Sequence, residues 1–433
     1  MGENMIGIND KLRELHENNK EIKVAVVGSG LMGKGMVSQL TLVKGMKPSL
    51  VVDRTLAKIL DAYNMAGISK EDIVIAKTLE DINVGMERGK FVACDNIDLV
   101  SKTNLIDVVV DATGRPDAGA KIAMDAINNK KHIVMLNVEA DSVIGPVLNK
   151  LAKEAGVIYT GTAGDEPGSV KEIYDFAEAS GFEILAIGKG KNNPIDYGAT
   201  PDSVKESADK IGLKPSMLAG FVDGTNTMIE MAVMANATGF IPDIRGGHGP
   251  QASTQELPGI FSLKEEGGIL NKYGVIDYVN GIAPGVFAIV TSKLPQVHNQ
   301  MQFLSMCPGP NYRLYRPYHL TSLETPITIA RASIYNLATI APRDKQVCDV
   351  ITIAKKDLKA GESLDGIGEY SVYGSIDTYE VAKEENLVPI GLIDKNTRVK
   401  RDIKKGEFIS YDMVDLDTST MIYKLRKLQE IMY

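Results

Sequence analysis

The sequence predicts an α/β protein with a doubly wound parallel sheet, followed by an α+β domain and a small β-rich domain. Two observations predict the parallel sheet. Short apolar strands alternate with helical segments along residues 1–160, and a glycine-rich turn joins the first strand to its helix. A third observation sets the last domain apart, because residues 345–433 change to short β runs separated by lysine-rich turns.

The chain is long enough for two or three domains. It has 433 residues, of which 44% are hydrophobic and 24% are charged, as is usual for a globular protein. We place boundaries near residues 160 and 345, where the texture of the sequence changes. The predicted domains are therefore 1–160, with the parallel sheet; 161–344, with a helix that returns to the first domain; and 345–433, with the β runs.

The first domain opens with a helix in "INDKLRELHENNK", where Leu12 and Leu15 have helical spacing. "IKVAVVGSGLMGKGMVSQL" then reads as a strand, a glycine-rich turn and a helix. Further strands are predicted in "PSLVVDR", "NLIDVVVDATG", "KHIVMLNVEAD" and "AGVIYTGTAGDEPG", with "DAGAKIAMDAINNK" as a helix between two of them. The segment 79–99 is less regular and is predicted to be an insertion.

The remaining elements follow the same logic. Helices are predicted in "VKEIYDFAEASG", in the apolar "DGTNTMIEMAVMANATG" and in the long "LETPITIARASIYNLATIAP". "FEILAIGKGKNN" reads as a strand that runs into a glycine-rich loop, and "FIPDIRGGHGP" as a turn-rich loop. "DVITIAKKDLKAGESLDGIG" and "TRVKRDIKKGEFISYDMVDLD" are the short β runs of the last domain.

Composition excludes several classes of protein. No stretch is apolar and long enough to cross a bilayer, and the polar N-terminus lacks the apolar core of a signal peptide. Cys94, Cys307 and Cys348 lie too far apart for a zinc motif or a disulfide framework. The net charge of −8 argues against nucleic-acid binding. We therefore expect a cytoplasmic protein that acts on neither membranes nor nucleic acid.

The glycine-rich turn has the spacing of a dinucleotide-binding Rossmann fingerprint. "GSGLMG" places Gly28, Gly30 and Gly33 between a strand and a helix, whose free N–H groups suit a diphosphate. Asp53 ends the next strand, where an acid is expected to bind the adenosine ribose. Asp53 favours NAD, whereas Arg54 beside it could hold the 2′-phosphate of NADP. The predicted cofactor-binding residues in these two segments are Gly28, Gly30, Leu31, Met32, Gly33, Asp53 and Arg54.

Later strand ends of the same sheet predict further contacts with the cofactor. In "DATG", Asp111, Thr113 and Gly114 could border the nicotinamide ribose, or Thr113 could instead cap the following turn. Asn137 follows the next strand and is included in the predicted cofactor site. The predicted cofactor is NAD(H) or NADP(H).

Three acids after strand ends could hold a hard cation such as Mg²⁺ or Mn²⁺. These are Glu139 in "LNVEAD" and Asp165 and Glu166 in "AGDEPG", since carboxylate oxygens are the ligands that these ions prefer. The alternative is that Asp165 and Glu166 cap the helix that opens near Gly168.

Two lysines flank one glycine in "ILAIGKGKNN", and we expect them to contact an oxygen-rich substrate. Lys189 and Lys191 lie where side chains at a strand end reach a ligand cleft. A lysine crowded by a second cation has a lowered pKa and can donate a proton near neutrality. The alternative is a solvated pair on a surface turn.

Two further loops supply catalytic candidates. "DGTNT" places Asp223 and Asn226 at a helix start, where Asp223 could instead be a plain N-cap. In "IRGGHGP" the consecutive glycines could form an anion nest, with Arg245 and His248 as charged donors. "GPNYRLYRPYHL", with Arg313 and Arg316, is predicted to be a second phosphate contact or an interface loop. The predicted catalytic residues are Lys189, Lys191, Asp223, Asn226, Arg245 and His248.

The fingerprint, "DATG", "GTAGDEPGS" and "ILAIGKGKNN" together resemble the layout of homoserine dehydrogenases. That family has an Asn-Gly-Thr-Thr-Asn loop where this chain has Lys189 to Asn193, and a lysine near the position of Glu139. "DLKAGESL" and "DIKKGEFI" resemble the repeated turns of a SAF domain, a small β-clip fold. A homoserine-dehydrogenase-like body with a SAF domain resembles the 1-deoxy-D-xylulose 5-phosphate reductoisomerase-like proteins of some bacteria.

This resemblance implies an NADPH-dependent reductoisomerase that forms 2-C-methyl-D-erythritol 4-phosphate for isoprenoid biosynthesis. It implies a small phosphorylated or polyhydroxylated substrate, a divalent cation and a homo-oligomer, either a dimer or a tetramer. One alternative is an NAD(P)-dependent dehydrogenase of another polyol, sugar acid or hydroxy amino acid. The alternative from another class is a non-catalytic sensor that binds a dinucleotide and a sugar.

Overall fold

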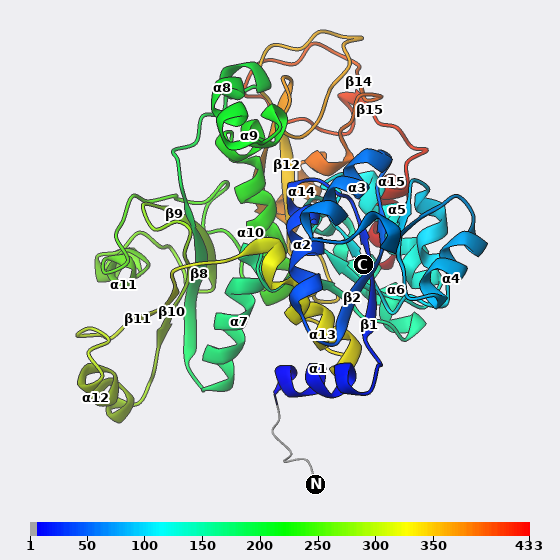
Figure 1. Ribbon diagram of the computed structural model, residues 1–433. Coiled ribbons are helices and arrows are strands. Elements are labelled where there is room, and N and C mark those ends of the chain that lie inside the picture. The colour runs from blue at the N-terminus through cyan, green and yellow to red at the C-terminus, as the bar shows by residue number, and fades with distance from the viewer. Residues whose placement is uncertain (1–6) are drawn as a thin grey trace. The chain divides into compact units, whose positions relative to one another are not determined.

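A computed structural model of the chain describes residues 7–433 and divides into two compact units. Unit 1 runs to Asp165 and also contains Leu320–Ala341, while unit 2 comprises Glu166–His319 and Pro342–Tyr433. Figure 1 labels the helices and strands of both units. The α/β class that the sequence predicts is confirmed, with a seven-stranded Rossmann-like sheet and additional smaller sheets.

Unit 1 is built on that seven-stranded sheet, in the order β3-β4-β2-β1-β5-β6-β7. Every neighbouring pair is parallel. Helices lie between successive strands, which is the doubly wound arrangement. The strands are β1 (Ile22–Val27), β2 (Met46–Val52), β3 (Ile73–Ala76), β4 (Phe91–Cys94), β5 (Val108–Asp111), β6 (His132–Met135) and β7 (Tyr159–Gly161).

The helices of unit 1 bury one face each against this sheet. The core joins strand residues such as Val24 and Val110 to Met36 and Leu40 on the first crossover helix. Burial of these side chains is the main stabilising term for the layer. The helices are α1 (Ile8–Glu17), α2 (Leu31–Leu42), α3 (Leu56–Met65), α4 (Leu79–Glu87), α5 (Pro116–Asn128), α6 (Val138–Ala155) and α13 (Thr325–Tyr335), with 3₁₀ turns η1 (Lys70–Asp72), η2 (Ile97–Lys102) and η4 (Thr321–Glu324).

The structure corrects the prediction that residues 79–99 form an irregular insertion. They contain α4, which begins with a capping box between Thr78 and Asp81, and the buried strand β4. β4 lies between β2 and β3 and is therefore part of the parallel sheet. A strand of four residues carries too little periodicity to stand out in the sequence.

The long helix predicted over residues 323–342 is shorter in the structure. α13 ends at Tyr335 because Asn336 adopts a left-handed conformation with φ +52°. Ile329 and Ala330 of α13 belong to the core of unit 1, although the helix follows much of unit 2 in the sequence. Beyond it, Ile340 bridges to Gly161 at the end of β7.

Unit 2 contains a four-stranded mixed sheet in the order β11-β10-β8-β9. β8 (Glu183–Lys191) pairs antiparallel with β10 (Val286–Thr291) and parallel with β9 (Val275–Asn280), and β11 (Tyr312–Arg316) pairs antiparallel with β10. Lys189 and Lys191 were expected at the end of a strand, and they are among the last three residues of β8, inside the strand and not in a loop that follows it. Both lysines lie inside β8 of the second sheet and are buried.

The other elements of unit 2 either surround this sheet or belong to the C-terminal part of the unit. They are α7 (Glu166–Ala179), α8 (Pro201–Ile211), α9 (Pro215–Val222), α10 (Thr225–Thr238), α11 (Leu257–Ile260), η3 (Lys264–Glu266), α12 (Pro295–Phe303), β12 (Cys348–Ala354), β13 (Val372–Thr378), α14 (Tyr379–Glu384), η5 (Ile390–Leu392), β14 (Arg398–Val399), β15 (Val414–Asp415) and α15 (Met421–Met432). The C-terminal helix α15 was not among the elements that the sequence predicts.

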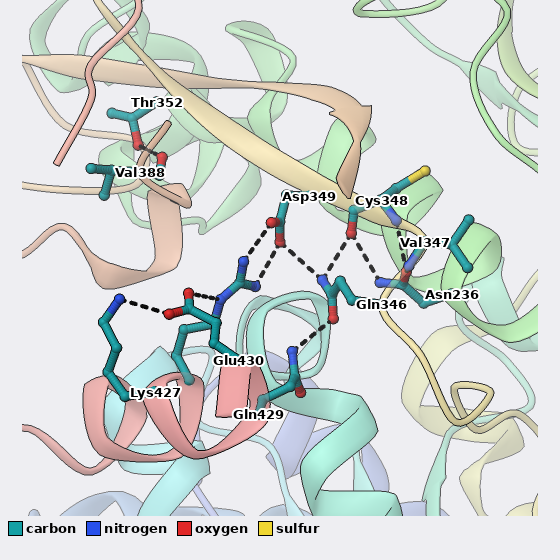
Figure 2. A network of polar contacts seen from close by, with 11 residues as sticks. Asn236, Gln346, Val347, Cys348, Asp349, Thr352, Val388, Lys427, Gln429 and Glu430 are labelled. Carbon is teal, nitrogen blue, oxygen red and sulfur yellow. Dashed lines mark hydrogen bonds and ion pairs between the residues drawn. The ribbon is translucent and has the colours of Figure 1, made fainter. Parts of the chain in front are cut away.

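The C-terminal part of unit 2 is bonded to both ends of α10. At one end Gly374 N–H donates to Thr225 Oγ1 at 2.9 Å, and at the other Asn236 Oδ1 accepts the N–H groups of Val347 and Cys348. Figure 2 shows how this second contact continues through Gln346 to the C-terminal helix. Residues 342–433 therefore position α10, and do so within one compact unit.

Among residues 7–433, no helix combines the length and apolar character needed to cross a bilayer.

Candidate active site

Each glycine of the fingerprint is required, or tolerated, for a different structural reason. Gly28 has φ +99°, and a Cβ there would lie 2.7 Å from the carbonyl oxygen of Ala112. A Cβ on Gly33 would lie 1.9 Å from the carbonyl oxygen of Gly28, so only glycine allows the helix to start this close to the turn. Gly30 differs, because a Cβ there would meet no atom of the protein within 4 Å. Its open side is where a dinucleotide diphosphate would approach.

Asp53 is held beside the glycine-rich turn by hydrogen bonds from a residue of the turn, Ser29. Its Oδ2 accepts hydrogen bonds from the N–H and Oγ of Ser29 at 2.9 and 3.0 Å, and its Oδ1 accepts the N–H of Thr55. Partial burial alone would raise the pKa of Asp53, but these hydrogen bonds hold it below its ordinary value. The carboxylate is therefore charged, and its role as an acceptor for ribose hydroxyls stays a prediction. Arg54 beside it is exposed.

Of the residues predicted at the later strand ends, the buried Asp111 and Asn137 form one hydrogen-bonded group with the partly buried Thr113, whereas Gly114 is exposed. Asn137 Nδ2 donates to Asp111 Oδ2 at 2.9 Å and lies 3.2 Å from Thr113 Oγ1. Thr113 N–H donates to Asp111 Oδ1, and Asn137 Oδ1 caps α6 through the N–H of Ala140. Thr113 therefore bonds to Asp111 and Asn137. It does not cap the following helix, because the N-cap position of α5 is Arg115.

Two acids of this group have raised pKa values. Burial raises the pKa of Asp111 to about 6, against the hydrogen bonds from Thr113 and Asn137. Burial, together with the charge of Asp111, raises the pKa of Glu139 to about 7. Glu139 thus lies beside the predicted cofactor residues of unit 1, and it is absent from the acid group that contains Glu166 and Glu230. This placement gives no support to Glu139 as a member of the same cation site.

Replacing Gly30 by leucine should weaken nicotinamide dinucleotide binding at least about tenfold while the fold survives. The reason is that a Cβ at this position meets no protein atom within 4 Å, so the added side chain would extend into the open side of the turn. Titration of NADH and NADPH fluorescence, with a thermal melt, measures both effects. Gly33→Ala is the matched control and should lower the melting temperature, because its Cβ strikes the backbone. Unchanged cofactor affinity in Gly30→Leu would contradict the assignment.

Asp53 and Arg54 should separate the two cofactors. Asp53→Ala should weaken NAD binding more than NADP binding. The variant loses the carboxylate that would accept from both ribose hydroxyls of NAD, but it also loses the charge that repels the 2′-phosphate of NADP. Arg54→Ala should weaken NADP alone if its exposed side chain holds that phosphate. Four titrations decide the question, and unchanged affinity in all of them would remove the pair from the site.

Lys189 is the centre of a buried ionic cluster in unit 2. Its ammonium donates to Glu166 Oε1 at 2.7 Å and forms a second, short contact with Glu230. The relative exposure of the three side chains is 6%, 14% and 9%, so water screens these pairs weakly. Burial alone would lower the pKa of Lys189, but the two carboxylates raise it above its ordinary value. Lys189 is therefore a permanent cation.

Lys191 lies two residues further along β8, and its pKa is shifted in the opposite direction. Its Nζ donates to the carbonyl oxygen of Phe221 at 2.8 Å. Burial, helped by the charge of Lys189, lowers the pKa of Lys191 to about 8. The lowered lysine pKa that the sequence predicts is found here, although burial is its largest cause. A lysine of this pKa can give or take a proton near neutrality.

Asp223 forms a second buried ion pair close to Lys191. It lies 2.7 Å from Lys355 Nζ, and both side chains are almost fully buried. Its Oδ1 also accepts the N–H of Thr225, the first residue of α10, but the N-cap position of this helix is Gly224 and not Asp223. Asn226, in the first turn of α10, is partly buried. Lys355 was not predicted, and its role is to compensate the charge of Asp223.

The glycine-rich nest forms as predicted, but it holds an anion of the protein itself. Asp277 accepts the N–H groups of His248 and Gly249 at 2.9 and 3.1 Å. The His248 ring pairs with Asp243, and Arg245 pairs with Asp377 and Glu385. These internal contacts give Arg245 and His248 a structural role, and their catalytic role stays a prediction.

Glu230 is the residue of the cluster that sequence reasoning missed. It lies in the middle of α10, whose other side chains are neutral and almost all buried. A single acid in such a helix is a detectable signal, because a buried carboxylate requires a cationic partner. Glu166 has a further neighbour in His319, whose Nε2 lies 3.3 Å from the same carboxylate.

Two family models match the chain, one on each part of the candidate site. Residues 28–160 match the model described as "Homoserine dehydrogenase, NAD binding domain", which contains the glycine turn, Asp53 and Asp111. Residues 164–325 match the model described as "Oxidoreductase DRL, catalytic domain", which contains the Lys189 cluster and Lys191. The chain is therefore an NAD(P)-dependent oxidoreductase with a nicotinamide dinucleotide cofactor, and not a non-catalytic sensor. No curated protein matches the sequence.

Several solved structures are similar to the chain at low identity. A probable dehydrogenase from Thermotoga maritima is 13% identical, with a TM-score of 0.42 and coverage of 73% of this chain and 90% of that chain. A DOX-P reductoisomerase in complex with magnesium is 13% identical, with a TM-score of 0.41 and coverage of 72% and 69%. Scyllo-inositol dehydrogenase from Lactobacillus casei, with bound NAD(H) and scyllo-inositol, is 14% identical, with a TM-score of 0.36 and coverage of 69% and 76%.

Proposed function

We propose that the protein is an NADPH-dependent reductoisomerase that converts 1-deoxy-D-xylulose 5-phosphate to 2-C-methyl-D-erythritol 4-phosphate. The observation that carries this proposal is the buried cluster of Lys189, Glu166 and Glu230, with Lys191 beside it on β8. It offers one fixed cation and one titratable amine, and a carbonyl that must be polarised and protonated requires both. The match of this segment to an oxidoreductase catalytic domain supports the assignment.

The reaction would proceed in two stages. In the first, the bond between C3 and C4 of the substrate is exchanged for one between C2 and C4. The C3 hydroxyl becomes an aldehyde, and the C2 oxygen takes up its proton. In the second, the aldehyde is reduced; the glycine turn and Asp53 would hold NADPH, which would supply the hydride. Lys191 donates the proton to the aldehyde oxygen, since its lowered pKa makes it an efficient acid near neutral pH. Lys189 keeps its charge and stabilises oxygen anions during both stages.

A divalent cation is part of this proposal. Glu166 and Glu230 have carboxylate oxygens within 4.8 Å of one another, and Asp165 directly precedes Glu166 in the chain. Such oxygen donors fit Mg²⁺ or Mn²⁺ in charge and type, and a bound ion would polarise the substrate carbonyl. The ammonium of Lys189 competes for the same two carboxylates. We therefore expect Lys189→Gln to bind Mn²⁺ more tightly than the unaltered protein, as measured by calorimetry.

A substrate panel tests the function directly. The purified protein is assayed with NADPH and then with NADH, against 1-deoxy-D-xylulose 5-phosphate and against unphosphorylated 1-deoxy-D-xylulose. Homoserine is assayed separately with the oxidised cofactors. Loss or gain of reduced-nicotinamide absorbance is followed with Mg²⁺, with Mn²⁺ and after EDTA treatment. Turnover confined to the sugar phosphate supports the proposal. Turnover of homoserine or a free polyol alone would replace it.

A second candidate is a dehydrogenase of an unphosphorylated polyol, sugar acid or hydroxy amino acid. It is favoured by the nest at residues 246–249, where Asp277 occupies the place that a substrate phosphate was predicted to take. The homoserine dehydrogenase model over residues 28–160 is consistent with it. The panel above separates the two candidates by the requirement for phosphate.

We also keep the proposal that residues 345–433 form a SAF-like domain with a structural role. The support is its hydrogen bonding to both ends of α10, the helix that carries Glu230. Its lysine-rich turns pair with nearby acids, as Lys359 does with Asp402 and Lys404 with Asp357. Those lysines therefore form ion pairs within the turns.

A further inference from the structure

Two polar side chains of β9 lie beside the two lysines of β8. The strands are parallel neighbours (Figure 1), and their register puts Tyr278 opposite Lys189 and Asn280 opposite Lys191. The backbones of such strands are about 4.8 Å apart, and paired residues point to the same face of the sheet. Lys189 reaches Glu230 of α10 from that face. Tyr278 and Asn280 therefore lie on the face of the sheet that carries the ionic cluster.

The ammonium of Lys191 has more hydrogen-bond donors than the described chain uses. An ammonium has three N–H donors. The Lys191 residue is 5% exposed, and among residues 7–433 only the carbonyl oxygen of Phe221 accepts a hydrogen bond from its Nζ. A buried donor without an acceptor costs free energy. The remaining donors of Lys191 therefore indicate a ligand that accepts hydrogen bonds at this point.

Asn280 and Tyr278 have the complementary kind of unused group. The Nδ2 of Asn280 donates to the carbonyl oxygen of Gly249 at 3.0 Å, but its buried Oδ1 accepts from no residue in the described range 7–433. Tyr278 is 8% exposed, and within the same range its hydroxyl makes no hydrogen bond. That hydroxyl also lies close to Gly249, since a Cβ on this glycine would be 2.2 Å from it. Both side chains thus approach one loop residue from one face of β9.

The combination of a donor and an acceptor selects a hydroxyl group. Lys191 can only donate while it is charged, the Oδ1 of Asn280 can only accept, and a tyrosine hydroxyl can do either. A fully ionised phosphate or a carboxylate offers acceptors alone, so the Oδ1 of Asn280 would repel it. A hydroxyl accepts from the ammonium and donates to the amide oxygen. Sites that hydrogen-bond a substrate hydroxyl discriminate strongly against analogues that lack it.

We propose that Asn280 and Tyr278 bind two hydroxyl groups of the substrate, and that one of these hydroxyls lies between Asn280 and Lys191. The inference rests on the proposed function for the place of the site, and it deepens that function by assigning the substrate class. The substrate carries at least two hydroxyls next to the lysines, and any phosphate group binds elsewhere. The oxygen that Lys191 protonates becomes a hydroxyl on reduction, and its proton then has an acceptor in Asn280.

Binding of three probes to variants of Asn280 tests the proposal. The probes are 2-C-methyl-D-erythritol 4-phosphate, erythritol and butyl phosphate, which has no hydroxyl on its chain. Ligand-observed NMR titrations use the protein saturated with NAD⁺ or NADP⁺, whichever binds more tightly. Asn280→Leu should weaken binding of the two hydroxylated probes at least about tenfold and leave butyl phosphate unchanged. Asn299→Leu, at an exposed asparagine of α12, is the matched control and should change none of the three affinities.

Asn280→Asp separates hydroxyl binding from a purely structural role. It keeps an oxygen acceptor but loses the amide that bonds to Gly249. If Asn280 binds a hydroxyl, this variant should hold both hydroxylated probes within about threefold of the unaltered protein. If Asn280 only fixes the loop, Asn280→Asp and Asn280→Leu should lose the same affinity, and the proposal would be overturned.

Tyr278→Phe provides a test that does not endanger the fold. It removes one oxygen that bonds to no residue of the described chain, so the melting temperature should not fall. The loss of one hydrogen bond should weaken both hydroxylated probes at least about threefold. If circular dichroism finds Asn280→Leu unfolded, Tyr278→Phe and Asn280→Asp carry the test.

The outcomes separate this inference from the proposed function. Binding of erythritol that depends on Asn280, without turnover of 1-deoxy-D-xylulose 5-phosphate, would support the hydroxyl site and reject the proposed reaction. Turnover of that substrate with unchanged probe affinities in Asn280→Leu and Tyr278→Phe would overturn the inference alone, because the two side chains would then bind only water. An unaltered protein that binds neither hydroxylated probe would overturn it as well.

Discussion

Replacing Lys191 by methionine is expected to lower turnover about a hundredfold while the reduced cofactor binds with unchanged affinity. Losing a charged contact that is strongest in the transition state costs about 3 kcal/mol, which is about two orders of magnitude in rate. Methionine fills a similar volume, so burial in β8 is retained. Cofactor affinity should survive because the glycine turn and Asp53 belong to unit 1, whereas Lys191 belongs to unit 2. Steady-state kinetics and NADPH titration on the same preparation measure both quantities.

The pH dependence gives the same residue a second signature. With its pKa lowered to about 8, Lys191 loses its proton above that pH, and reduction that requires the proton should decline there. The stability effect has the opposite direction. The unfolded chain keeps the proton up to the ordinary value of 10.5, so folding releases it between about 8 and 10.5 and stability should rise over this interval. Lys191→Met should remove both the activity limb and this rise.

Lys191 is a cleaner target than Lys189. Removing Lys189 would leave Glu166 and Glu230 buried without their cation, so lost activity could reflect a disturbed fold. Lys210→Met, on an exposed lysine that pairs with Glu206, is the matched control and should change neither turnover nor its pH profile. Turnover of Lys191→Met at the unaltered rate would contradict the catalytic role.

The local features of unit 1 could be predicted from the sequence. Gly28, Gly33 and Asp53 lie within a short segment, and their spacing reflects steric and hydrogen-bonding demands that act within one strand-turn-helix unit. β4 was missed although it lies in the same sheet, because its place between β2 and β3 depends on pairing between distant segments. Local periodicity carries no information on such pairing.

The cluster in unit 2 could be predicted only in part, for the same reason. The sequence predicted Lys189 and Lys191 at the end of a strand, and the structure has both among the last three residues of β8, with no turn between them. The partners of the predicted residues come from distant segments. Glu230, which pairs with Lys189, lies in α10, and Lys355, which pairs with Asp223, directly follows β12. The nest illustrates a further limit. Its glycines predicted an anion, but the sequence could not say that Asp277 is that anion.

Replacing Arg426 by methionine is expected to lower the free energy of unfolding by about 3–5 kcal/mol, as is typical when one partner of a buried ion pair is removed. The Arg426 side chain of α15 forms a bidentate contact with Asp349 of β12 at 2.8 and 2.6 Å. Figure 2 shows Asp349 and the polar groups around it. The relative exposure of the two side chains is 4% and 2%. Without the guanidinium, the Asp349 carboxylate would remain buried without its cation. Chemical denaturation measures the loss.

The double variant Arg426→Met with Asp349→Leu distinguishes a stranded charge from lost packing. Replacing both partners by apolar groups removes the uncompensated charge, so it should regain most of the stability that the single variant loses. Gln346 would keep a partner, because its Nε2 also donates to the carbonyl oxygen of Cys348 at 2.8 Å. That carbonyl also accepts from Asn236 of α10, so the link from the C-terminal helix towards the Glu230 helix would be retained. Equal losses in the single and double variants would mean that α15 is held by the shape of the arginine side chain, and that the charge of the pair contributes nothing.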